Sequence, residues 1–90
     1  MTPERIELRE GEAGYASNGQ IFISPSEIGI DLVLLRVGQD DSSASEVTVT
    51  VGQSVKVNAG ERFEVSLLGI GEGNLEENIP PSAKISVTRL

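Results

Sequence analysis

Apolar residues occupy every second position through the middle of the chain. The alternating set comprises Val47, Val49, Val51, Val55, Val57, Phe63, Val65 and Leu67. A period of two places such residues on one face of an extended chain, and the opposite face stays polar. The pattern therefore predicts strands over 46–51, 54–57 and 62–70, each with one buried face.

The same alternation occurs on both sides of this stretch. It predicts a short strand around Ile6 and Leu8, another from Gln20 to Ile23 and a last one from Ala83 to Val87. Turn signals recur about every ten residues, and no segment supplies the crossover helices of a parallel sheet. The fold class expected is all-β, a small antiparallel β-sandwich or partly open barrel of six to eight short strands. Residues 1–90 are expected to form a single domain, because a chain of this length builds one core.

The segment between Ser24 and Val37 carries two conflicting patterns. Ser24-Pro25-Ser26-Glu27 has the form of a helix capping box, whereas Gly29 and the β-branched residues after it disfavour a helix. We expect one helical turn at most over 24–29, followed by a strand from residue 30 to residue 37.

Both faces of that strand are apolar. Ile30, Leu32 and Leu34 share one face, and Val33, Leu35 and Val37 share the other. Leaving the second set in water would cost about 5–7 kcal/mol for roughly 200–300 Å² at 25 cal/mol per Å². A second copy of the chain is expected to cover this face, which gives a homodimer.

The connection at Gly52-Gln53 constrains how the flanking strands meet. A two-residue hairpin would set Val49 opposite Lys56 and mix the buried and exposed faces. The pattern therefore predicts either a longer loop or a corner at which the chain crosses between sheets. Long polar loops are expected over 38–45 and 69–82.

Composition narrows the chemistry. The chain has no His, Cys or Trp, which removes most familiar catalytic triads, thiol chemistry and zinc sites. Fourteen acidic and seven basic residues give a net charge of −7, which disfavours nucleic acid and anionic membrane surfaces as partners. No catalytic residue, metal or cofactor is predicted, and we do not expect an enzyme. With neither a long apolar run nor a basic leader, the chain is expected to be soluble and cytoplasmic.

Two motifs resemble ligand sites and are better explained as loops. Gly69, Gly71 and Gly73 lack the lysine and the following helix of a phosphate loop, so a bulge or hairpin is favoured. Asp40 and Asp41 are adjacent, so they point apart in an extended chain and do not surround one calcium ion.

Candidate binding residues are those that the strand pattern leaves unexplained. They are aromatic residues on turns or off-phase faces, charges within the apolar run, and polar or glycine positions in the loops. The set comprises Tyr15, Asn18, Phe22, Asp31, Arg36, Gly71, Glu72 and Asn74.

Elimination favours a small acidic, non-catalytic binding module that acts by protein-protein interaction, of the inhibitor, immunity or antagonist type. A first alternative is an oligomer that sequesters a small, nucleotide-type ligand in pockets between subunits. A second alternative is a structural decoration module.

Overall fold

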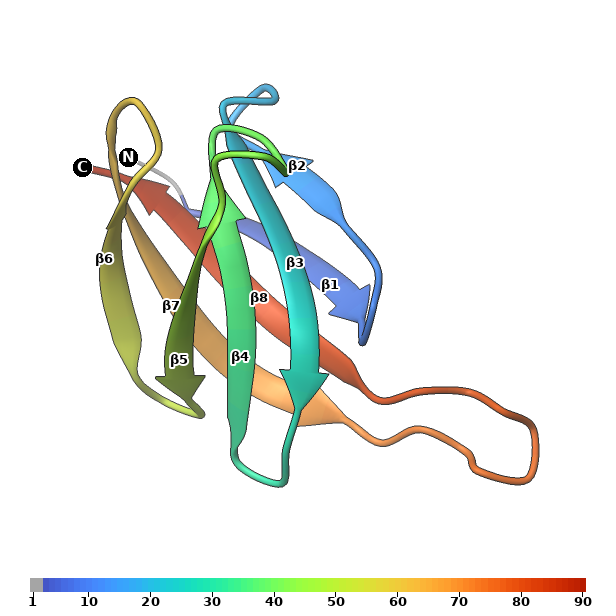
Figure 1. The fold of residues 1–90 in the computed structure, drawn as a ribbon. Coiled ribbons are helices and arrows are strands. Elements are labelled where there is room, and N and C mark those ends of the chain that lie inside the picture. The colour runs from blue at the N-terminus through green and yellow to red at the C-terminus, as the bar shows by residue number, and fades with distance from the viewer. Residues whose placement is uncertain (1–2) are drawn as a thin grey trace.

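The computed structural model describes residues 3–90 and confirms an all-β fold of eight strands in two antiparallel sheets. The strands are β1 (Glu4–Arg9), β2 (Gly14–Ala16), β3 (Ile21–Ile28), β4 (Leu32–Gly38), β5 (Ser45–Thr50), β6 (Ser54–Asn58), β7 (Arg62–Gly71) and β8 (Ser82–Arg89). Sheet 1 has the order β1-β8-β7-β6, and sheet 2 has the order β2-β3-β4-β5. Figure 1 shows the two sheets facing each other as a sandwich.

Strand order follows chain order almost throughout. Sheet 2 is an uninterrupted meander from β2 to β5, and sheet 1 continues it through β6, β7 and β8 before β1 pairs with β8. The strands thus run in a ring, as in a flattened barrel with two seams. In the described part of the chain, neither β1 and β2 nor β5 and β6 form a ladder across these seams.

Apolar side chains, aliphatic except for Phe63, fill the space between the sheets. The cluster includes Phe63, Val65 and Leu67 from β7, and Ile85 from β8, which is the face predicted from the alternating pattern. Burial of this face is the main favourable contribution in a chain without disulfides.

The connection at Gly52-Gln53 is the predicted corner between sheets. β5 belongs to sheet 2 and β6 to sheet 1. The corner is held on β7, because Gly52 N donates to Leu67 O at 2.9 Å and Leu67 N donates to Gln53 O at 3.1 Å. Crossing the sandwich here keeps the valines of both strands facing inward, which a two-residue hairpin would not.

Side chains and backbone groups close the other seam. Glu4 Oε2 accepts from Ser17 N at 2.9 Å, and Glu10 Oε2 accepts from Ile28 N at 2.8 Å. Gly11 N donates to Pro25 O at 2.8 Å. The contacts to Ile28 N and Pro25 O satisfy backbone groups of β3 in the part of the strand that β2 does not pair with.

The segment 24–29, for which one helical turn at most was expected, forms no helical turn, because β3 continues to Ile28. Pro25 lies in the part of β3 that β2 does not pair with. No ladder hydrogen bond is therefore lost through its missing N–H on that edge of the strand. A bulge between Pro25 and Glu27 absorbs the irregularity. Strand β4 begins at Leu32 rather than at residue 30, because Ile30 and Asp31 lie in the turn.

The face proposed for a homodimer lies inside the molecule. Val33, Leu35 and Val37 are buried against sheet 1, and Leu35 is 0% exposed. The two-sided apolar pattern arises because Leu32 and Leu34 point outward while the opposite sheet covers the inward set. The dimer predicted from this face therefore has no basis in it.

The β4–β5 loop is a solvated loop that hydrogen bonds to itself. The Asp40 carboxylate accepts from Ser42 Oγ at 2.8 Å and from Ser43 N at 2.9 Å. The Ser42 hydroxyl, followed by the Ser43 backbone and side chain, lowers the pKa of Asp40 below its ordinary value of 3.8. A carboxylate with a depressed pKa stabilises the fold above its unfolded pKa, and this stabilisation disappears as pH falls through the folded value.

We expect an NMR titration to place the pKa of Asp40 below 3.8 and Ser42→Ala to raise it, because the hydroxyl stabilises the charged form. Ser45→Ala is the control, since Ser45 is exposed at the start of β5. If Ser42→Ala leaves the pKa of Asp40 unchanged, the Ser42 hydroxyl is not what lowers it.

Candidate binding site at the β7–β8 arm

Strands β7 and β8 continue into a hairpin that projects from the sandwich. We call residues 72–81 the arm. Figure 1 shows it extending from the end of sheet 1, beyond the turn that joins β3 and β4. The glycine-rich segment that resembled a phosphate loop is the end of β7 and the start of this arm, with the expected bulge between Leu67 and Gly69.

Hydrogen bonds within the arm fix the shape of its tip. Asn74 and Ile79 exchange two backbone bonds, at 2.7 and 2.8 Å. Asn74 Oδ1 also accepts from Glu76 N at 3.0 Å and Glu77 N at 3.3 Å. The side-chain oxygen of Asn74 thus stabilises the turn by hydrogen bonds to its backbone. Within this turn, the neighbouring Leu75 points into solvent.

Close packing stiffens the base of the arm. A Cβ on Gly73 would lie 2.2 Å from Ile79 O and 2.7 Å from Pro80 C, so only glycine lets the two chains approach this closely. Pro80 and Pro81 restrict the returning chain. Arg9 Nη1 donates to Pro80 O at 2.8 Å, which ties the arm to β1.

An apolar groove of about 400 Å³ lies between the arm and the β3–β4 turn. We call it the arm groove. Its lining comprises Gly29, Ile30, Ile70, Gly71, Glu72, Gly73, Leu75, Ile79, Pro80 and Pro81. Ile30 is 99% exposed and Leu75 is 96% exposed. Two bulky aliphatic side chains almost fully in water at one groove identify it as the strongest candidate contact surface of the molecule.

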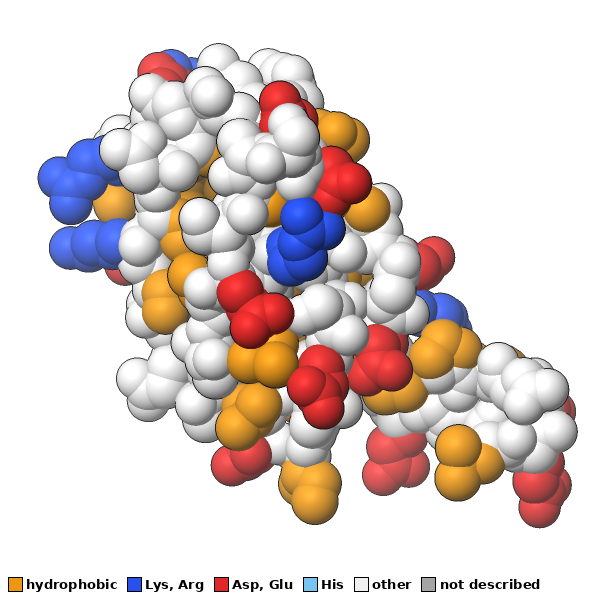
Figure 2. Space-filling model, viewed as in Figure 1, with side chains coloured by type: hydrophobic (Ala, Val, Ile, Leu, Met, Phe, Trp, Pro, Cys, Tyr) orange, Lys and Arg blue, Asp and Glu red, His pale blue; other side chains and the backbone are white. Residues whose placement is uncertain are grey.

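Acidic residues line the arm groove or flank its lining residues in the chain. Glu72 lines it, and Glu27, Asp31, Glu76 and Glu77 each lie within two residues of a lining residue. Figure 2 shows acidic side chains beside the hydrophobic ones at the base and the tip of the arm.

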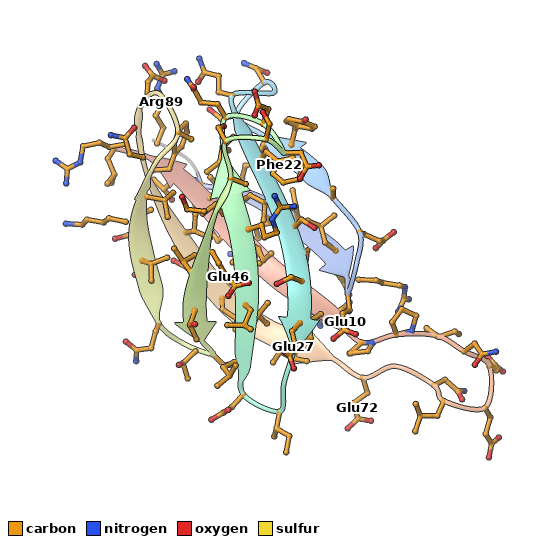
Figure 3. All side chains as sticks on the ribbon, viewed as in Figure 1. Glu10, Phe22, Glu27, Glu46, Glu72 and Arg89 are labelled. Carbon is orange, nitrogen blue, oxygen red and sulfur yellow. The ribbon has the colours of Figure 1, made fainter. Side chains whose placement is uncertain are left out.

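Glu10 adds a sixth carboxylate at the base of the arm. It accepts from Ile28 N, and its own N–H donates to Pro81 O at 3.0 Å. Figure 3 shows Glu10 and Glu27 near each other at this base, with Glu72 farther along the arm. Arg9 is a basic residue near these carboxylates, and its guanidinium hydrogen bonds to the backbone of Pro80, a lining residue of the arm groove. The surface therefore combines apolar knobs with strong local negative charge.

The candidate residues from the sequence fall into separate places. Asp31, Gly71, Glu72 and Asn74 gather at the arm end of the molecule. Asn18 lies in the β2–β3 turn, with a left-handed φ of 57°.

Tyr15, Phe22 and Arg36 share the outer face of sheet 2, on three different strands. Phe22 is only 4% exposed and packs edge-to-face with the Tyr15 ring at 5.5 Å, so Tyr15 covers it. Arg36 lies within β4, and its Nη1 pairs with Asp41 Oδ1 at 2.5 Å. Tyr15 and Phe22 thus contact each other, and Arg36 contacts the β4–β5 loop.

Ile30 and Leu75 were missed by the sequence reasoning. A signal for both was present, because each is a bulky aliphatic residue isolated among turn formers and acids, in Gly29-Ile30-Asp31 and in Asn74-Leu75-Glu76. The strand pattern had assigned Ile30 to a strand face and so concealed it.

Residues 3–90 form further hollows elsewhere on the surface. A polar cleft of about 350 Å³ at the opposite end of the molecule is lined by Gly19, Gln20, Gln39, Ala59, Gly60 and Glu61. A hollow of about 280 Å³ on sheet 1 is lined by Arg5, Ile6, Glu7, Leu68, Lys84 and Ile85. We call the latter the sheet-1 hollow.

Acidic residues in residues 3–90 do not form a group of three or more that could hold a metal ion. The same part of the chain has no helix that is long and apolar enough to cross a membrane. Comparisons with family models, curated proteins and solved structures found no match.

Proposed function

We propose that the protein is a small, non-catalytic, cytoplasmic binding module that contacts a partner protein through the arm and the arm groove. The observation that carries the proposal is the near-complete exposure of Ile30 and Leu75 on the two sides of one groove. Exposed aliphatic surface is unfavourable in water, and covering it on binding stabilises a complex.

The rigidity of the arm supports the same proposal. The hydrogen-bonded tip and the Pro80-Pro81 segment hold Leu75 in place before any partner arrives. A preorganised contact surface loses little conformational entropy on binding, so more of the contact energy appears as affinity.

Charge defines the chemistry of the partner surface. Glu72 lines the arm groove, four further acidic residues lie within two residues of its lining in the chain, and Glu10 contacts the base of the arm. A complementary surface presents an apolar side chain or an apolar hollow flanked by Lys or Arg.

Selection of displayed random peptides against the immobilised protein tests this function. We expect recovered peptides to combine bulky aliphatic residues with Lys or Arg, and to bind Ile30→Ser at least about tenfold more weakly than the wild type. Leu90→Ser is the matched control, because Leu90 is also an exposed aliphatic residue and lies outside the groove. Failure to recover any peptide, or equal binding to Ile30→Ser and to the wild type, would contradict the proposal.

A further inference from the structure

We infer that the chain binds a second copy of itself head to tail, with the arm tip of one copy in the sheet-1 hollow of the next. This inference rests on the proposed function, because it uses the arm as the contact surface. It goes further by identifying the partner surface, which the same chain carries.

The arm tip has the form of a charged knob. Leu75 is 96% exposed at its end, and Glu76 and Glu77 follow it in the same turn. The tip therefore presents one aliphatic side chain with two carboxylates beside it.

The sheet-1 hollow has the complementary form. Ile6, Ile85 and Leu67 occupy matched positions and face the core, so the alternate residues Arg5, Glu7 and Lys84 point outward from sheet 1. Leu68 projects from the bulge in β7 and is 48% exposed. The hollow thus offers aliphatic surface from Leu68, with Arg5 and Lys84 as cations at its rim.

Glu7 is the one carboxylate of the hollow, and it accepts from Ser82 Oγ at 2.7 Å. A volume of about 280 Å³ is ample for a leucine side chain. Docking there would cover two exposed leucines, Leu75 of one copy and Leu68 of the other, and would place opposite charges next to each other.

The distribution of charge over the fold gives independent support. The four strands of sheet 1 carry six basic residues (Arg5, Arg9, Lys56, Arg62, Lys84 and Arg89) and three acidic residues (Glu4, Glu7 and Glu64), a local charge of +3. The connections between strands hold nine acidic residues and none of the basic ones in residues 3–90. The molecule is thus acidic at its loops and arm and basic on the sheet that contains the hollow.

The arm tip does not reach the sheet-1 hollow of the same molecule. Leu68 lies four residues before the arm starts, and the arm projects away from sheet 1 rather than folding back over it. A tip that binds the hollow of another copy leaves one tip and one hollow free in the pair. Such a heterologous contact repeats, and it ends in a ring or continues as a chain of copies.

Sedimentation velocity over a concentration series up to about 1 mM tests the inference, a range set by the weak affinity expected of a small contact. The knob variant is Glu76→Lys with Glu77→Lys, and the hollow variant is Arg5→Glu with Lys84→Glu. We expect the wild type to form oligomers larger than dimers, and each variant to associate at least about tenfold more weakly because like charges then meet. An equimolar mixture of the two variants should associate again, because each knob then finds a hollow of opposite charge.

Charge-matched controls separate the contact from net charge. Glu12→Lys with Glu46→Lys changes the net charge as the knob variant does, and Lys56→Glu with Arg62→Glu changes it as the hollow variant does. Both pairs lie outside the tip and the hollow, so they should associate like the wild type. Lys84→Ser replaces the double hollow variant if circular dichroism shows that the variant is unfolded, since it places no carboxylate beside Glu7.

A wild type that stays monomeric over the whole range overturns the inference and leaves the peptide-binding test of the proposed function intact. Association that survives Leu75→Ser and both charge reversals also overturns it, because the copies then meet elsewhere. Failure of the mixture to recover would equally contradict a head-to-tail contact.

Discussion

Replacing Leu35 with lysine should unfold the protein. Leu35 is 0% exposed in the middle of β4, between Pro25 on β3 and Val47 on β5, with sheet 1 above it. An ammonium group at this position would lose its hydration without gaining a partner. We expect the free energy of unfolding to fall by about 5 kcal/mol or more, which is comparable to the whole stability of a domain this size. Circular dichroism and urea denaturation measure the effect.

Leu34→Lys is the matched control on the neighbouring position. Leu34 points out of sheet 2, opposite Glu27 and Thr48, so a lysine there stays in water near a carboxylate. The expected change in stability is about 1 kcal/mol or less. Similar losses from both substitutions would mean that β4 does not have one inward and one outward face.

Truncation of Phe63 should cause the second-largest loss. Phe63 is fully buried, and its strand neighbours are Val57 on β6 and Arg89 on β8. Phe63→Ala removes the ring from a core that is otherwise aliphatic and leaves a cavity. We expect the free energy of unfolding to fall by about 3–5 kcal/mol. The melting temperature should fall by about 15 °C or more.

Phe63→Leu restores most of the lost volume and should cost only about 1–2 kcal/mol. The difference between the two variants isolates the cavity from the loss of aromatic character. Equal losses would show that shape at this position matters more than volume.

Alternation along the chain predicted most of the fold because one buried face leaves a clear period of two. It located β5, β6 and β7 within one or two residues, and the valine pairing reduced the connection at Gly52-Gln53 to a longer loop or a corner, of which the structure has the corner. It failed where a strand departs from regular pairing. β3 passes through Pro25 and a bulge, and the local capping signal there is overridden by pairing with β4.

The sequence pattern predicted that a second copy of the chain covers the apolar face of β4, whereas sheet 1 of the same molecule covers it. Strand pattern gives the two faces of a segment but does not tell which one the molecule itself covers. Val33 and Leu35 face sheet 1, and the contact between distant segments that covers them leaves no local signal.

The candidate site was predicted only in part. Glu72 was placed correctly in a prominent loop, whereas Gly71 is the last residue of β7. The groove depends on how near that loop lies to the β3–β4 turn. Arrangements between distant loops follow from sheet twist and strand length, which the sequence pattern does not give. The net charge of −7 also did not predict how charge is distributed over the fold, because the strands of sheet 1 carry a local charge of +3.

The strands follow one another around the sandwich in chain order, and the first strand, β1, pairs with the last, β8. β1 begins beside the end of β8, with Glu4 opposite Val87. A short peptide that joins these ends would allow new chain ends to be opened at any turn of the meander, since every remaining connection links neighbours in space. The architecture therefore depends on the cyclic order of the strands rather than on which strand comes first, and circular permutants opened between β1 and β2 or between β5 and β6 would keep both sheets.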